Sequence, residues 1–341
     1  MNSRRHLTHG FTIIELVIVV VVISVLAAIT FVSYGGVQDS ARKAALMSDL
    51  DNAVSILELD LKQTGNYPTT VAGAGNGTGL SPSPGTTYQY AFNNTNTPKT
   101  FCLTATKGTL SYNINQEGVP SAGACPVLHL DAGIATSYPG SGTVLNDLSG
   151  KGKNAVLVNG VAYDSAKGGS WVFDGVNDTI NLGTGNTFFP LPNFSMELWF
   201  KSDGTTPTTG VSPGLLGITY GVRLFVYTST LSFGLDTGTA VTYLDTPSTY
   251  SFYNSSWHQV VIQATPTKRE IYVDGSLANT KIDNWPGITQ WPTNTANIGR
   301  DNNNVNYFFR GNIASIKIYD SNLSASEVNQ NFNAARNRYG I

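Results

Sequence analysis

Charged residues are scarce in this 341-residue chain. They make up 12% of the sequence, and the formal net charge is −2. Proteins that bind nucleic acid present clusters of Lys and Arg to the phosphates, and the totals here contain no excess of basic residues. We therefore predict no nucleic-acid partner.

Cysteine and histidine are scarce as well. The two cysteines, Cys102 and Cys125, are too few for a structural zinc site, which needs about four ligands. The four histidines form no spaced ligand cluster. If the chain is exported, the cysteines can form a disulfide, and closing a loop of this size stabilises a fold by about 3 kcal/mol. Two free buried thiols are the alternative.

One long apolar run, residues 11–32, contains a single charged residue, Glu15. A membrane-spanning helix needs about 20 residues, so this run is long enough to span. Two arginines precede it and should stay on the cytoplasmic side. A secretory signal peptide, with Ala27-Ala28 as its cleavage site, and a plain membrane anchor are the alternatives. Neither explains a carboxylate near the start of the run.

The start of this run resembles that of type IV pilins and pseudopilins. The matching residues are Gly10, Phe11 and Glu15, between a basic leader and a long apolar helix. The resemblance implies a leader at 1–10, cleavage by prepilin peptidase between Gly10 and Phe11, and methylation of the new amine. It also implies insertion in the cytoplasmic membrane through 11–32, followed by assembly with other pilin subunits and the pilus assembly platform into an extracellular pilus at the cell surface.

Glu15 would then be the assembly residue. A buried carboxylate is tolerated when it finds a cationic partner. In a filament of packed helices, the free amine of Phe11 from a neighbouring subunit can be that partner.

Helical periodicity continues beyond the apolar run and predicts one helix over 11–63. We expect a kink or local melting at Gly35-Gly36, because each glycine costs about 1 kcal/mol in a helix. From 64 to 126 we predict a small pilin-type β subdomain, with an exposed loop at 69–87 and strands at 87–92, 100–106 and 110–115. By resemblance to pilins, the cysteine pair would staple this region.

From residue 127 onward the pattern is almost entirely β. Alternating runs occur at 170–175, 194–201, 223–236, 258–275 and 311–320. Many short strands over about 200 residues favour a sandwich or a jelly roll. Near the end, Ser324 and Glu327 form a capping box, which predicts a short helix that packs through Val328 and Phe332.

This region resembles the laminin-G-like, concanavalin A-like lectin/glucanase superfamily. The best-matching pieces include WVFDGVNDTINLG (171–183), SSWHQVVI (255–262) and REIYVDGSL (269–277). The predicted fold class is therefore α+β: a long N-terminal pilin helix with a small β subdomain, followed by an all-β concanavalin A-like jelly-roll sandwich at 127–341.

The acids of a glucanase are missing. Such enzymes place carboxylates at alternate positions of one strand, on either side of the scissile bond. On the candidate strand, Glu197 has Ser195 and Trp199 as its neighbours on the same face. No G-x-S-x-G motif or catalytic triad signature is present either, so we predict that the chain is not an enzyme.

Two sets of residues are candidates for ligand binding in the jelly roll. Oxygen-rich stretches could hold Ca²⁺, and the best candidates are Asp174, Asn177, Asp178 and Asp301, although Asn and Asp are also common in ordinary turns. Trp285, Trp291 and Tyr307 could stack on a sugar, although the tryptophans could equally cap the core of the sandwich.

Three functions fit these features. The first is a minor or tip subunit of a type IV pilus that displays a lectin-like jelly roll for adhesion to an extracellular glycan or protein ligand. The second is a pseudopilin of a type II secretion or DNA-uptake machine. A membrane-anchored glycoside hydrolase is disfavoured because the acids are missing.

Overall fold

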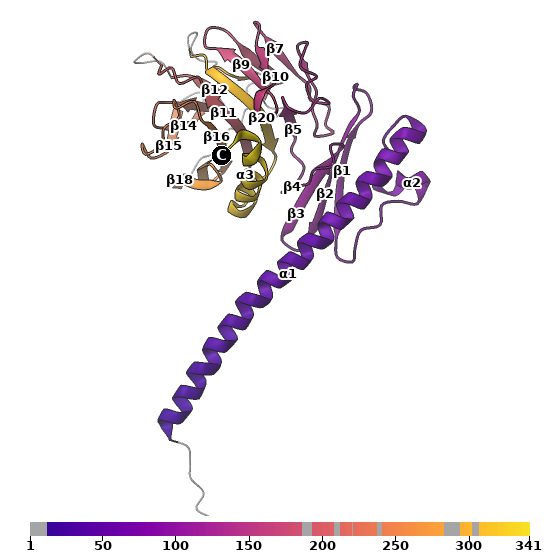
Figure 1. The fold of residues 1–341 in the computed structure, drawn as a ribbon, viewed down its shortest axis with the longest axis vertical. Helices are drawn as coiled ribbons and strands as arrows, with labels where there is room; N and C mark the ends of the chain where they lie inside the picture. Colours follow the sequence, from indigo (N-terminus) through magenta and orange to yellow (C-terminus); the bar gives the residue numbers. More distant parts are fainter. Residues whose placement is uncertain are drawn as a thin grey trace, which may run out of the picture.

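The computed structural model describes residues 12–185, 193–207, 212–219, 221–236, 241–282, 294–301 and 307–341, without the side chains of 28–35. A long helix, α1, leads to a small four-stranded sheet, and a two-sheet sandwich lies beyond that sheet (Figure 1).

Helix α1 spans Ile13–Thr64. It starts with a capping box, in which the Thr12 hydroxyl accepts from the Glu15 N–H at 3.2 Å and the Glu15 carboxylate accepts from the Thr12 N–H at 3.3 Å. It ends at Gly65, which adopts the left-handed conformation that a C-cap favours.

The kink or local melting expected at Gly35-Gly36 is wrong, because α1 continues through both glycines as one helix (Figure 1). Glycine weakens a helix but can adopt helical angles, and the long flanking segments propagate the hydrogen-bond ladder across the pair.

The two halves of α1 differ in exposure. In the first half, apolar side chains such as Ile13, Leu16 and Leu26 are exposed. Within the part of the chain that the structure describes, no helix combines the length and apolarity needed to cross a membrane. Membrane insertion through 11–32 stays a prediction.

The second half of α1 is buried by the small sheet. Leu46, Leu50 and Leu57 lie at its contact face and form one core with Phe101 and Ile114 of the sheet. The sheet order is β1-β2-β3-β4, with strands Thr87–Asn93, Thr100–Lys107, Leu110–Asn115 and Ser121–Ala122. The first three strands confirm the predicted ones.

The segment before this sheet and the cysteine pair complete the small domain. The loop predicted at 69–87 contains two short helical segments, η1 (Val71–Gly73) and α2 (Ala74–Gly77). Cys102 of β2 and Cys125 form a disulfide, as predicted. The bond ties the end of the small domain to its central strand.

The C-terminal domain is a sandwich of two antiparallel sheets. One, which we call the open sheet, has the order β15-β14-β13-β12-β19-β10-β7-β6. The other, which we call the covered sheet, has the order β18-β17-β16-β11-β20-β9-β8, with β5 paired to β20. Side chains of both sheets form one core, which includes Leu198, Leu224, Phe233 and Ile316.

The strand bounds are as follows. The open sheet contains β6 (Val144–Leu145), β7 (Ala155–Val158), β10 (Thr179–Thr184), β12 (Gly214–Ile218), β13 (Val222–Val226), β14 (Leu231–Asp236), β15 (Val241–Asp245) and β19 (Thr295–Ile298). The covered sheet contains β5 (Leu128–Asp131), β8 (Ala162–Asp164), β9 (Ser170–Asp174), β11 (Phe194–Ser202), β16 (Trp257–Thr265), β17 (Lys268–Val273), β18 (Ser276–Ile282) and β20 (Arg310–Tyr319); the short helix η2 (Ala166–Gly168) joins β8 to β9.

Helix α3 (Ala325–Tyr339) covers the outer surface of the covered sheet. It starts with the predicted capping box of Ser324 and Glu327. Val328 is fully buried, and the Phe332 ring stacks on Trp199 of β11 with centroids 5.7 Å apart. The predicted packing of this helix is confirmed.

Helix α3 also joins the sandwich to the small sheet. Asn331 accepts a hydrogen bond from the Ala122 N–H at 3.0 Å and donates to the Ala122 carbonyl at 3.3 Å. In Figure 1, α3 lies between the covered sheet and β4. The outer face of the covered sheet therefore carries α3, and in Figure 1 β14 and β15 of the open sheet lie on the side of the sandwich away from the small domain.

Candidate ligand-binding surface

Three strands of the open sheet place side chains in rows on its outer face. Side chains alternate along a strand, so residues in register across neighbouring strands share one face. Two rows result from the register: Arg223, Gly234 and Tyr243, and Phe225, Ser232 and Asp245.

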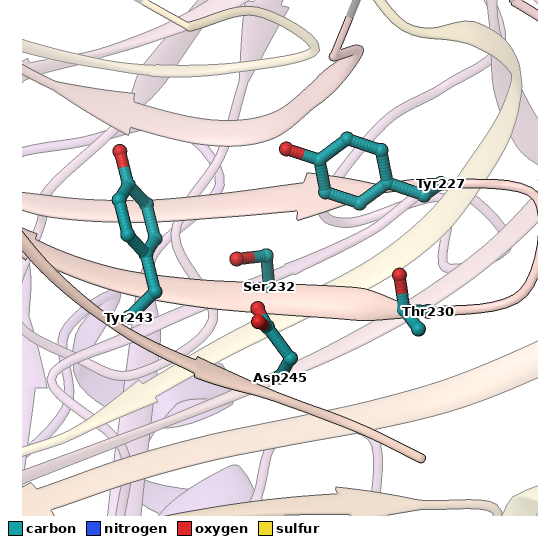
Figure 2. Close-up of a pocket in the computed structure, with 5 residues that line it drawn as sticks. All are labelled: Tyr227, Thr230, Ser232, Tyr243 and Asp245. Atoms are coloured by element: carbon teal, nitrogen blue, oxygen red, sulfur yellow. The ribbon is translucent and has the colours of Figure 1, made fainter. Parts of the chain in front are cut away.

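Next to these rows lies the turn between β13 and β14. The Tyr227 N–H donates to the Thr230 carbonyl at 2.8 Å, which holds both residues at the end of the hairpin. Tyr227, Thr230, Ser232, Tyr243 and Asp245 line a surface cavity of about 340 Å³, which we call the two-tyrosine pocket. In Figure 2 the two rings lie on either side of the Ser232 hydroxyl and the Asp245 carboxylate.

Gly234 makes room for one wall of this pocket. A Cβ atom at this position would lie 2.8 Å from Cε1 of Tyr243, closer than non-bonded carbon atoms approach. Because the glycine has no side chain, the Tyr243 ring can lie across β14 and remain 41% exposed.

A buried ion pair supports the same wall. Arg223 donates to both carboxylate oxygens of Asp301, at 3.0 and 2.6 Å, and to the Tyr243 hydroxyl at 3.3 Å. Burial lowers the pKa of Arg223, but its hydrogen bonds to Asp301 outweigh this effect and the guanidinium stays charged. Burial raises the pKa of Tyr243, so its hydroxyl keeps its proton at neutral pH.

An arrangement of this kind can bind a sugar. Aromatic rings offer apolar faces to the C–H side of a sugar ring, while hydroxyl and carboxylate oxygens accept hydrogen bonds from its hydroxyl groups. Shallow pockets that combine a few polar groups with aromatic side chains are typical of such recognition.

The residues predicted to hold calcium lie in two places. Asp174, Asn177 and Asp178 share one turn after β9, in which the Asp174 N–H donates to Asp178 at 3.0 Å. Asp301 belongs to a different place, where both of its carboxylate oxygens accept hydrogen bonds from Arg223. Among the described residues, no group of three or more His, Cys, Asp and Glu side chains could hold a metal ion. Calcium binding stays a prediction.

The two carboxyl groups of this turn have pKa values that are shifted in opposite directions. Burial raises the pKa of Asp178, and the nearby charge of Asp174 adds to this shift. For Asp174, burial works in the same direction, but N–H groups of Val176 and Asn177 outweigh it and lower the pKa. The Asp178 Oδ1 atom is buried and has no hydrogen-bond partner among the described residues.

The predicted aromatic and processing residues are only partly described. Trp285, Trp291, Gly10 and Phe11 lie outside the described residues. The Tyr307 carbonyl accepts hydrogen bonds from the N–H groups of Gly214 and Asp301. Tyr307 therefore lies next to the Arg223–Asp301 pair and does not line the two-tyrosine pocket.

Sequence reasoning missed the pocket residues. The alternation at 223–236 was visible and places Arg223, Phe225 and Tyr227 on one side of the chain. Strand β15, which contributes Tyr243 and Asp245, was not predicted, and without its register the second wall of the pocket could not be found.

A second cavity, also of about 340 Å³, lies between the small domain, the covered sheet and α3. Its lining includes Glu117, His129, Glu197 and Lys317. Glu197 is buried; its Oε1 atom accepts from Gln259 at 3.0 Å, and its Oε2 atom has no hydrogen-bond partner among the described residues. Residues of both domains line this cavity, whereas the two-tyrosine pocket lies on the outer face of the open sheet alone.

Two family models match the chain. Residues 5–31 match the prokaryotic N-terminal methylation motif, and residues 173–329 match a model of the concanavalin A-like lectin/glucanases superfamily. No curated protein matched the chain.

Two of the solved structures that align with this chain are toxin binding domains. The binding domain of Paraclostridial Mosquitocidal Protein 1 aligns with a TM-score of 0.51 and 17% identity over 63% of this chain and 55% of that one. The receptor binding domain of the botulinum neurotoxin C/D mosaic serotype aligns with a TM-score of 0.48 and 16% identity, over 62% of this chain and 51% of that one. The chain thus spans about half the length of these proteins, and at such identity the likeness concerns the fold alone.

The matches agree with the predicted fold class, in which a long N-terminal helix precedes an all-β jelly-roll sandwich. The chain joins the N-terminal methylation motif of type IV pilins and pseudopilins to a laminin-G-like domain of the concanavalin A-like lectin/glucanase superfamily.

Proposed function

We propose that this chain is a minor or tip subunit of a type IV pilus and that its jelly roll binds glycans at the cell surface. Prepilin peptidase would cleave it after Gly10 in the cytoplasmic membrane. The assembly platform would then pack its N-terminal helix against those of other pilin subunits. The exposed apolar side chains in the first half of α1 support this step, since neighbouring helices would bury them.

The orientation of the jelly roll supports display. The outer face of the covered sheet is occupied by α3, whereas β14 and β15 of the open sheet lie on the side of the sandwich away from the small domain (Figure 1). A ligand outside the filament could therefore reach the open sheet without displacing α3. The two-tyrosine pocket on this sheet is the observation that carries the proposal.

We propose no catalytic role. Glu197 is buried and hydrogen-bonded to Gln259, and its neighbours on the outer face of β11 are Ser195 and Trp199 rather than acids. Glycoside hydrolysis needs two carboxyl groups on either side of the bond.

A glycan array tests the proposed binding. We expect the full-length chain, purified in detergent, to bind a subset of glycans. Tyr243→Ala and Tyr227→Ala should each weaken binding at least tenfold, because each removes one wall of the pocket. Tyr163→Ala is a matched control, since this partly buried tyrosine packs on Tyr138 of the jelly roll and does not line the pocket. Binding that survives both pocket substitutions would contradict the proposal.

A further inference from the structure

The charge inside the two-tyrosine pocket has one sign. Among the described residues that line it, Asp245 is the one ionisable group charged at neutral pH, beside two tyrosines, a threonine and a serine. The described lining therefore offers a carboxylate and no cation to a ligand.

The Asp245 carboxylate is not engaged by the described part of the protein. Its side chain is exposed and makes no hydrogen bond or ion pair there; the Asn279 amide donates at 2.7 Å to its backbone carbonyl instead. A carboxylate in this state can bind a ligand without first losing a partner.

The cationic side chains near the pocket, Arg223 and Lys281, donate hydrogen bonds to groups other than the Asp245 carboxylate. The guanidinium of Arg223 donates to both oxygens of Asp301 and to the Tyr243 hydroxyl. The Lys281 ammonium donates to the Tyr243 carbonyl at 3.4 Å, on the backbone of β15. The further carboxylate of Asp236, buried on β14, lies close enough to Arg223 to affect its pKa. The local charge around the pocket therefore favours a cation.

The aromatic walls favour the same kind of ligand. A cation over the face of a tyrosine ring is attracted by about 0.5–1 kcal/mol at an exposed site, and an ammonium–carboxylate hydrogen bond is stronger than a neutral one. The hydroxyls of Thr230 and Ser232 add polar contacts that suit the hydroxyl groups of a sugar better than an apolar cation.

We propose that the two-tyrosine pocket selects amino sugars that carry a free ammonium group over their N-acetylated forms. The ammonium lies against Asp245 between the rings of Tyr227 and Tyr243, and sugar hydroxyls reach Ser232 and Thr230. N-acetylation removes the positive charge and turns the strongest contact into a weak one. This inference rests on the proposed function, because it concerns the ligand of the same surface.

Paired trisaccharides test it. The probes are β-1,4-linked glucosamine trisaccharide and its fully N-acetylated counterpart, titrated at slightly acidic pH into the full-length chain in detergent. We expect the free-amine form to bind at least tenfold tighter, with a preference that shrinks as salt is raised. In Asp245→Asn the preference should fall below threefold while the affinity for the acetylated form stays the same.

Two further variants serve as controls for this result. Asp245→Glu keeps the charge and should keep the preference, so a folding defect in Asp245→Asn would be recognised by comparison. Asp320→Asn removes an exposed carboxylate at the end of β20 and should change nothing.

The outcomes separate the two proposals. Equal binding of both trisaccharides, or a preference that persists in Asp245→Asn, overturns the inference while glycan binding stands. Binding of choline as tight as that of the glucosamine trisaccharide also overturns it, because the pocket would then recognise a cation and no sugar. If no glycan binds and Tyr243→Ala has no effect on any probe, the proposed function itself fails.

Discussion

At the scale of single residues, the pocket depends on an absent side chain. Gly234 lies in register between Arg223 and Tyr243, and the Tyr243 ring occupies the space that a Cβ atom would need. The ring then reaches Arg223, whose position is fixed by Asp301. A small residue on one strand thus determines the position of a large one on the next.

Gly234→Ala should therefore displace the Tyr243 ring and reduce glycan binding at least tenfold. Overpacking of this kind costs about 1–3 kcal/mol, and thermal unfolding should show a loss in that range with the fold retained. Tyr243→Phe is the control: it keeps the ring and loses only the hydrogen bond from Arg223, so most binding should remain. Unchanged binding in Gly234→Ala would show that the Tyr243 ring is not a wall of the site.

Asp178 gives a pH-dependent prediction. Its raised pKa means that ionisation costs more in the folded than in the unfolded chain; this cost is present at neutral pH and vanishes below the unfolded value. Asp178→Asn should therefore be more stable than the wild type at pH 7, and the difference should disappear near pH 3. Denaturant unfolding at the two pH values measures this.

The same variant tests calcium. If the turn of Asp174 and Asp178 binds Ca²⁺, added Ca²⁺ should raise the melting temperature of the wild type and leave that of Asp178→Asn unchanged. A wild type that does not respond to Ca²⁺ would refute the calcium prediction for this turn.

At the scale of secondary-structure elements, α3 holds the two domains together. Its inner side packs on the covered sheet, and Asn331 exchanges two hydrogen bonds with the backbone of Ala122 in β4. Both partners are buried, so loss of the Asn331 side chain would leave the Ala122 N–H and carbonyl without their partner.

Asn331→Ala should destabilise the chain by about 1–3 kcal/mol, the usual cost of an unsatisfied buried backbone group. Limited proteolysis should then cut more readily between the disulfide-bonded region and β5, because the sandwich is held less firmly. Asn333→Ala on the exposed side of α3 is the matched control, since within the described part of the chain its side chain hydrogen-bonds to Asn329 of the same helix and not to the small domain. Equal stability of the two variants would mean that the contact through Asn331 does not hold the domains together.

Local patterns explain what the sequence could predict. The capping box at Ser324, the helix end near residue 63 and the strands of the small sheet depend on residues close together in the chain, and all are confirmed. The pocket depends instead on register between β13, β14 and β15, which no single segment encodes.

Two expectations show the same limit. Asp301 looked like a metal ligand in an oxygen-rich stretch, but Arg223, 78 positions earlier in the chain, uses both of its oxygens. The glycine pair at 35-36 predicted a kink or local melting, but the length of the flanking helix decides the outcome.

At the scale of the whole molecule, a long helix with an exposed apolar half is joined through the small domain to a sandwich, in which β14 and β15 lie on the side away from the small domain (Figure 1). The two ends suit different surroundings. The helix offers apolar surface to other helices, and the jelly roll offers a pocket with hydroxyls and a carboxylate to a ligand in water.

Glu15 belongs to this scale, because its expected partner is another subunit. Its carboxylate accepts from the Thr12 N–H in the capping box, and the proposed amine of a neighbouring Phe11 would add a charge-assisted contact. Glu15→Leu should be cleaved normally but give at least tenfold fewer filaments that contain this chain. Immunoblots of processed chain and of sheared filaments measure both steps. Normal amounts of the Glu15→Leu chain in sheared filaments would contradict the assembly role of Glu15.

Immunogold electron microscopy with an antibody against the jelly roll tests most directly the claim that the pilin helix displays this domain outside the cell. On cells that produce the wild type, the account predicts gold along or at the ends of extracellular filaments, and its loss from filaments in Glu15→Leu. Gold confined to the cell envelope, with none on filaments, would contradict display on a pilus and favour a pseudopilin of a secretion or DNA-uptake machine.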